Sequence, residues 1–242
     1  QVTLLEEPQA AFYAWIARHP DWRERVKVGD LILVVDVGGG TTDFSLIAVT
    51  ESGGELQLER IAVGEHILLG GDNMDLALAR LLEQDLKEKG KNLDALQLNA
   101  LWQGCRAAKE KLLSSSEKLN DYPVTILGRG TGLVGGTIKT KLKRADAERI
   151  VLDGFFPETK SDEMPLRQRR IALVEIGLPY AADAAVTRHM AKFLRQQAAN
   201  AEHGSLRRSA SGMAAPTHVL FNGGVFNAQP LRDRILTTLN SW

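Results

Sequence analysis

Residues 31–49 read LILVVDVGGGTTDFSLIAV, and this stretch decides the fold of the chain. Five apolar residues, 31–35, lead into Asp36, and three glycines at 38–40 separate them from a second β-type run at 44–49. Two strands joined by glycines form a hairpin in which the backbone itself can approach a neighbouring group closely. Successive N–H groups of such a turn can point into one concavity, which binds phosphate oxygens. The stretch therefore predicts a strand–turn–strand phosphate loop.

Carboxylates at both ends of the turn narrow the choice of ligand. Asp36 precedes the glycines and Asp43 follows them. Bare carboxylates repel phosphate, so their placement makes chemical sense if a hydrated Mg²⁺ lies between them and the anion. We therefore expect Asp36 and Asp43 to hold Mg²⁺ through water, in one half of a nucleotide-phosphate clamp.

Three other interpretations of this segment fit the residues less well. A glycine-rich hairpin can be no more than a tight turn. A dinucleotide-binding loop requires a helix directly after its glycines, whereas residues 41–49 are rich in β-branched and aromatic side chains. A Walker loop is excluded because no Gly-Lys-Ser/Thr follows the glycines. The pattern favours the phosphate loop of the actin-like ATPases.

Four further segments make the chain resemble a known family. In order along the chain they are EPQAA at 7–11, LGGDNMD at 69–75, CRAAK at 105–109 with serines 114–116, and VLFNGG at 219–224. Their types and order, together with the phosphate loop, resemble the second half of the ATPase domain of DnaK-type chaperones, the heat shock protein 70 family. Residues 117–215 match the family pattern only loosely.

The resemblance implies a fold and a domain organisation. The expected fold class is α/β: an actin-like ATPase (ribonuclease H-like) lobe, with a mixed sheet flanked by helices and an inserted α+β subdomain. Residues 1–66 and 177–242 would form the outer subdomain, and residues 67–176 the inserted one. In the family, a first lobe carries a second phosphate loop and a catalytic lysine. This chain has one such loop and starts at Gln1, so we expect a fragment of a longer protein without that first lobe.

The pattern of residues also predicts individual elements. Helices are expected at 8–17, from 72 or 73 to 90, at 94–113, from 146 onward and at 181–198. Strands are expected at 31–37, 42–50, 55–63 and 217–221, with a hairpin formed by 123–127 and 133–142. Two stretches rich in proline, charge or small residues, 157–169 and 203–215, predict an exposed connection and a mobile loop.

ATP hydrolysis depends on positioned phosphates, neutralised charge and an oriented water more than on a protein nucleophile. The turn glycines would donate N–H groups to the β- and γ-phosphates, and Asp36 could orient the attacking water. Thr41 would add a hydroxyl contact to the γ-phosphate. Glu7 is implied to be a hinge carboxylate near the metal, although an acid at a helix start is an equally good interpretation. The expected catalytic residues are Asp36, Thr41, Asp43 and Glu7, with Gly38, Gly39, Gly40 and Thr41 at the phosphates.

The other half of the expected site would contact adenosine. Gly71 and Asp72 could approach the ribose, although Asp72 could equally be a simple helix N-cap. Lys109 could flank the adenine, although an exposed helical lysine is the commoner case. A second glycine pair would let the base lie close to the backbone. The implied adenosine contacts are Gly71, Asp72, Lys109, Gly223, Gly224 and Asn227.

This adenosine half departs from the family pattern. Arg106 stands where an acidic ribose contact is usual, and Glu110 stands where a basic residue stacks on adenine. Leu113 replaces a serine, and Val225 and Asn227 replace a serine and an arginine. Losing a hydrogen bond or a cation stack costs about 1–2 kcal/mol. We therefore expect weaker nucleotide affinity or relaxed base selectivity.

Composition places limits on partners and compartment. Thirty basic and thirty acidic residues cancel, so no global field draws the 242-residue chain to nucleic acid or to anionic lipid. No apolar run approaches the roughly 18 residues of a membrane span. The single cysteine, Cys105, suits a reducing compartment, and the five scattered histidines predict no zinc site. We expect a cytoplasmic protein that binds neither nucleic acid nor membrane.

Three functions follow from the motifs. The first is a DnaK-like chaperone ATPase, which uses ATP hydrolysis to ADP to drive lobe movement and binding of unfolded peptide clients. Its partners would be the missing first lobe and a co-chaperone or exchange factor, and this lobe alone would be nearly inactive. The alternatives are a metabolite kinase of the actin-like superfamily and an actin-like nucleotide-binding scaffold with little turnover. The cofactors in the first case are ATP or ADP and Mg²⁺.

Overall fold

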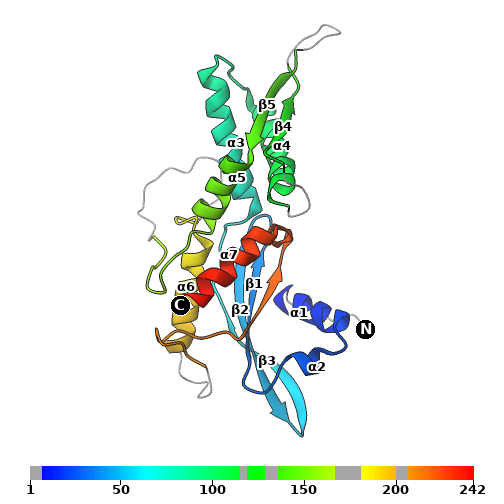
Figure 1. The fold of residues 1–242 in the computed structure, drawn as a ribbon, viewed down its shortest axis with the longest axis vertical. Helices are drawn as coiled ribbons and strands as arrows, with labels where there is room; N and C mark the ends of the chain where they lie inside the picture. Colours follow the sequence, from blue (N-terminus) through cyan, green and yellow to red (C-terminus); the bar gives the residue numbers. More distant parts are fainter. Residues whose placement is uncertain (1–6, 115–118, 129–135, 167–180, 200–206) are drawn as a thin grey trace.

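The computed structural model describes residues 7–114, 119–128, 136–166, 181–199 and 207–242 (Figure 1). In these residues the chain forms a four-stranded mixed sheet, a separate two-stranded hairpin, and helices packed against both. The observed mixed α/β class, with a sheet flanked by helices, agrees with the expected one. No helix in the described ranges combines the length and the apolar character needed to cross a bilayer.

The sheet has the strand order β3-β2-β1-β6. β1 (Leu31–Val37), β2 (Thr42–Ser52) and β3 (Glu55–Val63) form an antiparallel meander. The three strands and the β1–β2 hairpin are as predicted, and the pairing of β3 with β2 is added by the structure. Between β2 and β3, Gly53 and Gly54 both have positive φ, which a two-residue hairpin turn requires. β6 (His218–Asn222) returns from the far end of the chain and pairs with β1 in parallel.

Alternating residues of β1 face two different apolar layers. Ile32 and Val34 pack in a cluster with Trp22 and Val26, beside α1 (Glu7–Arg18) and α2 (Trp22–Arg25). The odd-numbered residues of β1 belong to the main core, which includes buried residues of α6 (Val186–Ala199) and α7 (Gln229–Asn240). Because both faces are covered, every residue of β1 is buried.

A second group of elements stands beyond one end of the sheet (Figure 1). It consists of α3 (Gly71–Glu88), α4 (Ala95–Leu113), β4 (Asp121–Ile126), β5 (Ile138–Lys143), α5 (Arg144–Ile150) and a π-helical turn, Val151–Phe155. The predicted helix at 94–113 is confirmed, and the predicted hairpin is formed by β4 and β5 with residues 129–135 outside the described ranges. Buried side chains of these elements join the main core without a break. Cys105 is one of them, and burial raises the pKa of its thiol to about 12.

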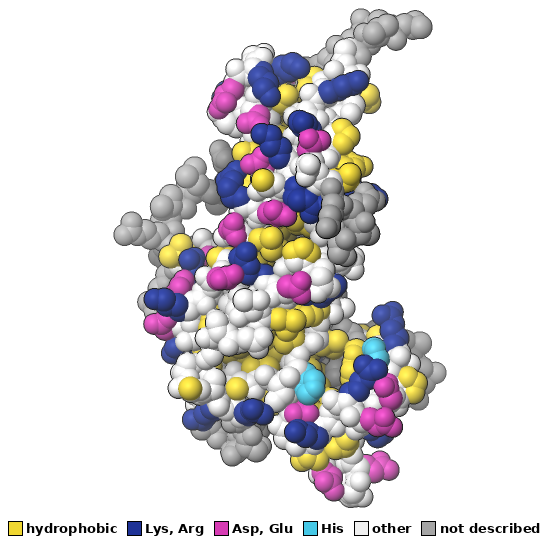
Figure 2. Space-filling view, viewed as in Figure 1, with side chains coloured by type: hydrophobic (Ala, Val, Ile, Leu, Met, Phe, Trp, Pro, Cys, Tyr) yellow, Lys and Arg dark blue, Asp and Glu magenta, His cyan; other side chains and the backbone are white. Residues whose placement is uncertain are grey.

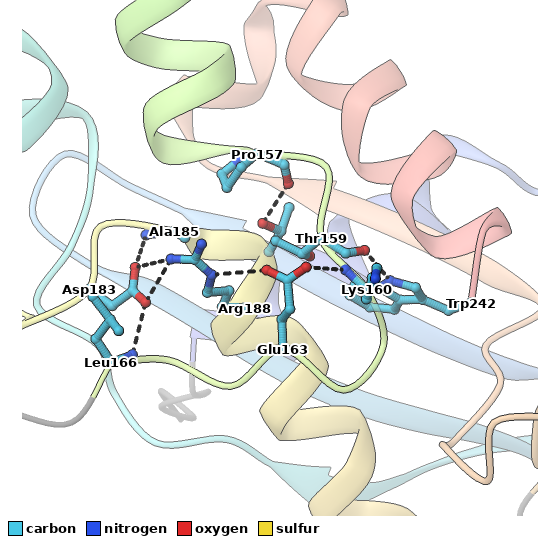
Figure 3. Close-up of polar contacts among 10 residues, drawn as sticks. Pro157, Thr159, Lys160, Glu163, Leu166, Asp183, Ala185, Arg188 and Trp242 are labelled. Atoms are coloured by element: carbon cyan, nitrogen blue, oxygen red, sulfur yellow. Dashed lines mark hydrogen bonds and ion pairs between the residues drawn. The ribbon is translucent and has the colours of Figure 1, made fainter.

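The segment before α6 differs from expectation. Helix α6 begins at Val186 and not at 181, because the buried Asp183 carboxylate accepts N–H groups from Ala185 at 2.8 Å and from Leu166 at 2.9 Å (Figure 3). Arg188 of α6 then donates to Asp183 at 3.2 Å and lies 3.5 Å from Glu163. These contacts attach the chain at 163–166 to the start of the helix.

The predicted exposed connection at 157–169 is confirmed in part: its described residues, 157–166, form no helix or strand and expose Met164 and Leu166, but some of them are held by specific contacts. Thr159 is buried, and its carbonyl accepts the indole N–H of Trp242 at 2.7 Å (Figure 3). Pro157 accepts the Thr187 hydroxyl at 2.8 Å. In the other expected loop, the described part 207–215 buries Met213 and Ala214. Both connections are thus packed onto helices and are not simply solvated.

Charges on the visible surface are mixed in sign. Figure 2 shows Lys and Arg side chains interspersed with Asp and Glu over both the sheet end and the helical end of the molecule. This distribution accompanies a formal net charge of zero. The face shown in Figure 2 therefore carries no large patch of purely positive or purely negative side chains.

Candidate functional site

The turn between β1 and β2 is closed by its own backbone. Gly38 donates its N–H to the carbonyl of Thr41 at 2.9 Å, and the strands on either side pair Asp36 opposite Asp43. Both carboxylates thus lie at the same level of the hairpin, directly below the glycines. Thr42, the first residue of β2, is buried and donates its hydroxyl to the Leu69 carbonyl at 2.8 Å. This bond attaches the turn to the segment that leads into α3.

The N-terminus of α3 packs directly on this turn. Gly71 and Asp72 donate their N–H groups to the carbonyls of Gly38 and Gly39, at 2.9 and 2.8 Å. A Cβ at Gly70 would lie 2.4 Å from the Gly39 carbonyl oxygen, so only glycine permits this approach. Gly70 is itself the N-cap residue. The alternative that Asp72 caps the helix is therefore wrong.

Asp36 is buried at the end of β1. Its Oδ2 accepts a hydrogen bond from the side-chain amide of Asn222 at 2.7 Å, because β6 places Asn222 beside it in register. Burial raises the pKa of the Asp36 carboxyl above its usual value; the Asn222 hydrogen bond opposes this shift and the Asp43 charge adds to it. Next along the chain, Gly223 has φ +86°, and a Cβ there would lie 2.1 Å from the Val37 carbonyl oxygen.

Asp43 is more accessible and has a different partner. Its Oδ1 lies 2.8 Å from Nδ1 of His66, which comes from the segment between β3 and α3. His66 and Asn222 are not among the residues expected from the sequence. Asn222 directly precedes the expected Gly-Gly motif, which is a usable signal, whereas nothing in the local pattern around His66 points to Asp43.

A cavity of about 280 Å³ lies against the turn and brings together segments that are distant in sequence. Its walls come from the β1–β2 turn, the start of α3, the last turns of α4, and the short 3₁₀ helix Gly224–Asn227 that leads into α7. Seven of the predicted site residues line it: Gly38, Gly39, Gly71, Asp72, Lys109, Gly224 and Asn227.

Other predicted site residues lie near the turn but do not line this cavity. Asp36, Gly40, Thr41, Asp43 and Gly223 belong to this group. Glu7 is the first residue of α1, and its side chain lies outside what the structure describes. The hairpin therefore has a carboxylate side, at Asp36 and Asp43, and a cavity side, at Gly38 and Gly39.

Charged side chains form the α4 wall of the cavity. Lys109 is buried, so the alternative of an exposed helical lysine is wrong; its Nζ lies 2.7 Å from Asp75 Oδ1 and 3.3 Å from the Gly71 carbonyl. Burial raises the pKa of the Asp75 carboxyl, and the Lys109 charge opposes the shift. At the exposed rim, Arg106 lies 3.6 Å from Glu110 and 3.9 Å from Asp72.

The described residues contain no cluster of three or more His, Cys, Asp or Glu side chains that could hold a metal ion. The turn instead offers two carboxylates, Asp36 and Asp43, beside a glycine backbone that is partly free of neighbouring atoms. Such a pair can hold the hydration waters of a cation, and the glycine backbone beside it can donate to an anion.

Comparison with known protein families identifies a family that contains most of the segments around the cavity. The fold and cavity define a mixed α/β protein in which two glycine turns and two helices surround one pocket. A family model described as "Hsp70 protein" matches residues 4–176, which include the β1–β2 turn, α3 and α4. The match covers well over half of the chain, and the chain therefore belongs to the Hsp70 family.

The chain is also similar to a curated relative, "Chaperone protein DnaK" of Carsonella ruddii (strain PV). The two are 27% identical over 172 residues, which are 70% of this chain and 27% of the relative. The chain thus matches about a quarter of that protein's length. The low identity marks this chain as a divergent member of the family.

Proposed function

We propose that this chain is the ATP-binding lobe of a DnaK-like chaperone ATPase, the second lobe of its nucleotide-binding domain. The observation that carries the proposal is the cavity in which the Gly38–Gly39 turn, the start of α3, α4 and the Gly224–Asn227 turn converge. Each wall comes from one of the segments on which the family resemblance was drawn. Membership of the Hsp70 family supports an ATPase of the chaperone type.

The glycines fit a bound nucleotide because they divide into two kinds. A Cβ at Gly70 or Gly223 would overlap backbone atoms, so these residues are required for the packing of the turns. A Cβ at Gly40 or Gly224 would meet no atom within 4 Å, so their backbone faces open space. Open backbone beside two carboxylates is suited to phosphate oxygens and a hydrated Mg²⁺.

The size of the cavity fits part of a nucleotide. Complete ligand pockets are about 300–1,000 Å³, and this cavity of about 280 Å³ lies at the lower limit. We infer that the first lobe of the full-length protein supplies the facing wall. The isolated lobe would then hydrolyse almost no ATP, because half of the phosphate clamp is absent.

In the phosphate half, bound Mg²⁺ would neutralise the charge of the phosphates. Asp36 and Asp43 would hold its water ligands, and Asp36 would also orient the attacking water. The N–H groups of Gly39 and Gly40 would donate to the β- and γ-phosphates. The Gly38 N–H, also expected from the sequence to donate to phosphate, is already bonded to the Thr41 carbonyl, so Gly38 would only shape the turn. Thr41 would add its hydroxyl, and Glu7 would be the hinge carboxylate on the side of the first lobe.

In the adenosine half, Gly71 and Asp72 would lie along the ribose, and the turn at Gly223, Gly224 and Asn227 would lie along the base. The Lys109 ammonium is held by Asp75, so Lys109 would contribute a fixed wall and not a mobile stacking cation. Glu110 at the rim offers a hydrogen-bond acceptor in place of a basic residue. This half would bind adenosine less tightly than a standard chaperone site.

The wider activity of the full-length protein follows from the same proposal. Hydrolysis of ATP to ADP would change the angle between this lobe and the first lobe and so control binding of peptide clients. A co-chaperone or exchange factor would act on that cycle. The outer subdomain at 1–66 and 177–242 would carry the phosphate and adenosine turns, and the inserted subdomain at 67–176 would close over the nucleotide.

Calorimetric titration with Mg-ADP and Mg-ATP tests the proposal. We expect the full-length protein to bind both nucleotides, Asp36→Ala to lose most of the binding, and the isolated lobe to bind weakly. Asp121→Ala is the matched control, because it also removes a carboxylate but from an exposed surface pair on the hairpin, 2.7 Å from Lys141. Absence of binding to the full-length protein would refute the assignment.

A further inference from the structure

The side chain of Asn222 is unusual for its place in the fold. It ends β6, a strand that pairs in parallel with the fully buried β1. β6 is the edge strand of the mixed sheet, and the residues before Asn222, Leu220 and Phe221, are apolar and pack against the clusters on its two faces. Asn222 instead donates its Nδ2–H to Asp36 Oδ2 at 2.7 Å.

The backbone after Asn222 confines the same carboxylate from another direction. A Cβ at Gly223 would lie 2.9 Å from Asp36 Oδ1, so the glycine backbone passes close to the oxygen that Asn222 does not bind. Asn222 therefore bonds one oxygen of Asp36, and the glycine at 223 leaves room for the other, which any larger residue there would crowd.

An amide is chemically suited to this position. The Nδ2 group donates a hydrogen bond and carries no charge, so it can orient a carboxylate without neutralising it. A lysine or arginine at the same place would form an ion pair and compete with a cation for the carboxylate. An apolar side chain would leave a buried carboxylate oxygen without a donor.

The inference rests on the proposed function: we propose that Asn222 is a positioning residue that holds the Asp36 carboxyl group in one orientation for the hydrated Mg²⁺ of the bound nucleotide. Because Asn222 directly precedes the Gly223–Gly224 turn, it also connects the adenosine half of the site to the metal carboxylate. The resemblance to the family assigns no role to this residue.

The test measures how much Mg²⁺ strengthens ADP binding to the full-length protein, by calorimetry with excess Mg²⁺ and with a chelator. In Asn222→Val we expect the Mg²⁺-dependent gain in affinity to fall about tenfold, which corresponds to one hydrogen bond to a charged group. Affinity for ADP without Mg²⁺ should stay within about twofold. Asn222→Ser, whose side chain is too short to reach Asp36, should show the same loss and replaces the valine variant if that variant misfolds.

Thr217→Val is the matched control. Thr217 also makes side-chain hydrogen bonds to β1, accepting from the Leu31 N–H at 3.1 Å, but at the end of the strand pair remote from the turn. It should retain the full Mg²⁺-dependent gain. An equal loss in Thr217→Val would show that any weakening of the strand pair has the effect, and would overturn the positioning role.

Two further outcomes are distinguishable. If the wild-type protein binds ADP with a Mg²⁺-dependent gain and Asn222→Val keeps that gain, the inference is wrong while the proposed function stands. If the wild-type protein shows no nucleotide binding at all, the proposed function fails, and this inference fails with it.

Discussion

The β1–β2 end of the cavity is held together by backbone groups, whereas the α4 end is held together by charged side chains. At the first end, the N–H groups of Gly71 and Asp72 donate to carbonyls of the turn, and glycine is required where chains approach each other. At the second end, Lys109 and Asp75 form a buried ion pair, and Arg106 lies at the rim.

This difference explains where the chain departs from its family pattern. The glycine turn matches the pattern closely, because a backbone wall depends on conformations that few residues other than glycine can adopt. Of the five departures, Arg106, Glu110 and Leu113 lie on α4, and Val225 and Asn227 lie in the short helix after Gly223. All five are changes of side chain and none replaces a turn glycine. Under the proposed function, such a site can alter its adenosine contacts while its phosphate turn stays the same.

The largest expected effect on stability is at a glycine where two backbone segments meet beside the β1–β2 turn. Gly223→Ala should lower the free energy of unfolding by about 4 kcal/mol, because it combines a left-handed backbone with overlap of backbone atoms. Urea denaturation measures the change. Gly40→Ala is the control: its Cβ would meet nothing within 4 Å, so we expect stability to change by less than about 0.5 kcal/mol. Equal losses in both variants would contradict the comparison.

The next effect concerns the ion pair at the other end. Lys109→Met should cost about 3 kcal/mol, because it leaves the Asp75 carboxylate buried without its partner. The double variant Lys109→Met/Asp75→Leu should recover most of this loss, since no buried charge then remains. If the double variant is less stable than Lys109→Met, the wall depends on packing of these chains and not on charge.

A smaller effect, opposite in sign, is expected at Asp36. Its folded-state pKa is raised by burial, so protonation stabilises the fold; that contribution is present below 3.8 and is lost as the pH rises through the raised pKa. Asp36→Asn should therefore be more stable than wild type at neutral pH, with a difference that shrinks as the pH falls toward 3.8. Thermal unfolding across pH measures this, and Asp121→Asn, at an exposed carboxylate, should show no such trend.

The smallest effect on stability is expected at the rim. Glu110→Gln removes an exposed charge that lies 3.6 Å from Arg106, and surface pairs contribute about 0–1 kcal/mol. Unfolding should barely change, whereas the affinities for ATP and GTP should shift relative to each other if Glu110 contacts the base. An unchanged ratio of the two affinities in calorimetry would place the base away from Glu110.

Much of this arrangement could be predicted from the sequence. The β-type runs around 38–40 predicted β1 and β2, and the spacing of apolar residues predicted α4, because both depend on local pattern. The partners of the two carboxylates could not be predicted in this way. Asn222 and His66 reach Asp36 and Asp43 only through strand order and a linker path, which are tertiary facts.

Prediction from the local sequence pattern was also wrong where a polar side chain is buried. The expected helix at 181–198 starts later because Asp183 binds backbone N–H groups that would otherwise enter the helix. Lys109 fits the pattern of a solvated helical residue, and only the position of α3 shows that Asp75 faces it. The sequence singled out Lys109 but not Asp183, and in neither case did it identify the group that the side chain contacts.

The parallel pairing of β1 with β6 has a consequence for how the molecule folds. Asp36 and Asn222, which meet in this pair, are separated by 186 residues. Contacts of such high contact order form slowly, because a long loop must close before any stabilisation is gained. During synthesis, β1 through α5 emerge from the ribosome well before β6. The carboxylate therefore acquires its hydrogen-bond donor only after β6 has been made and has paired with β1.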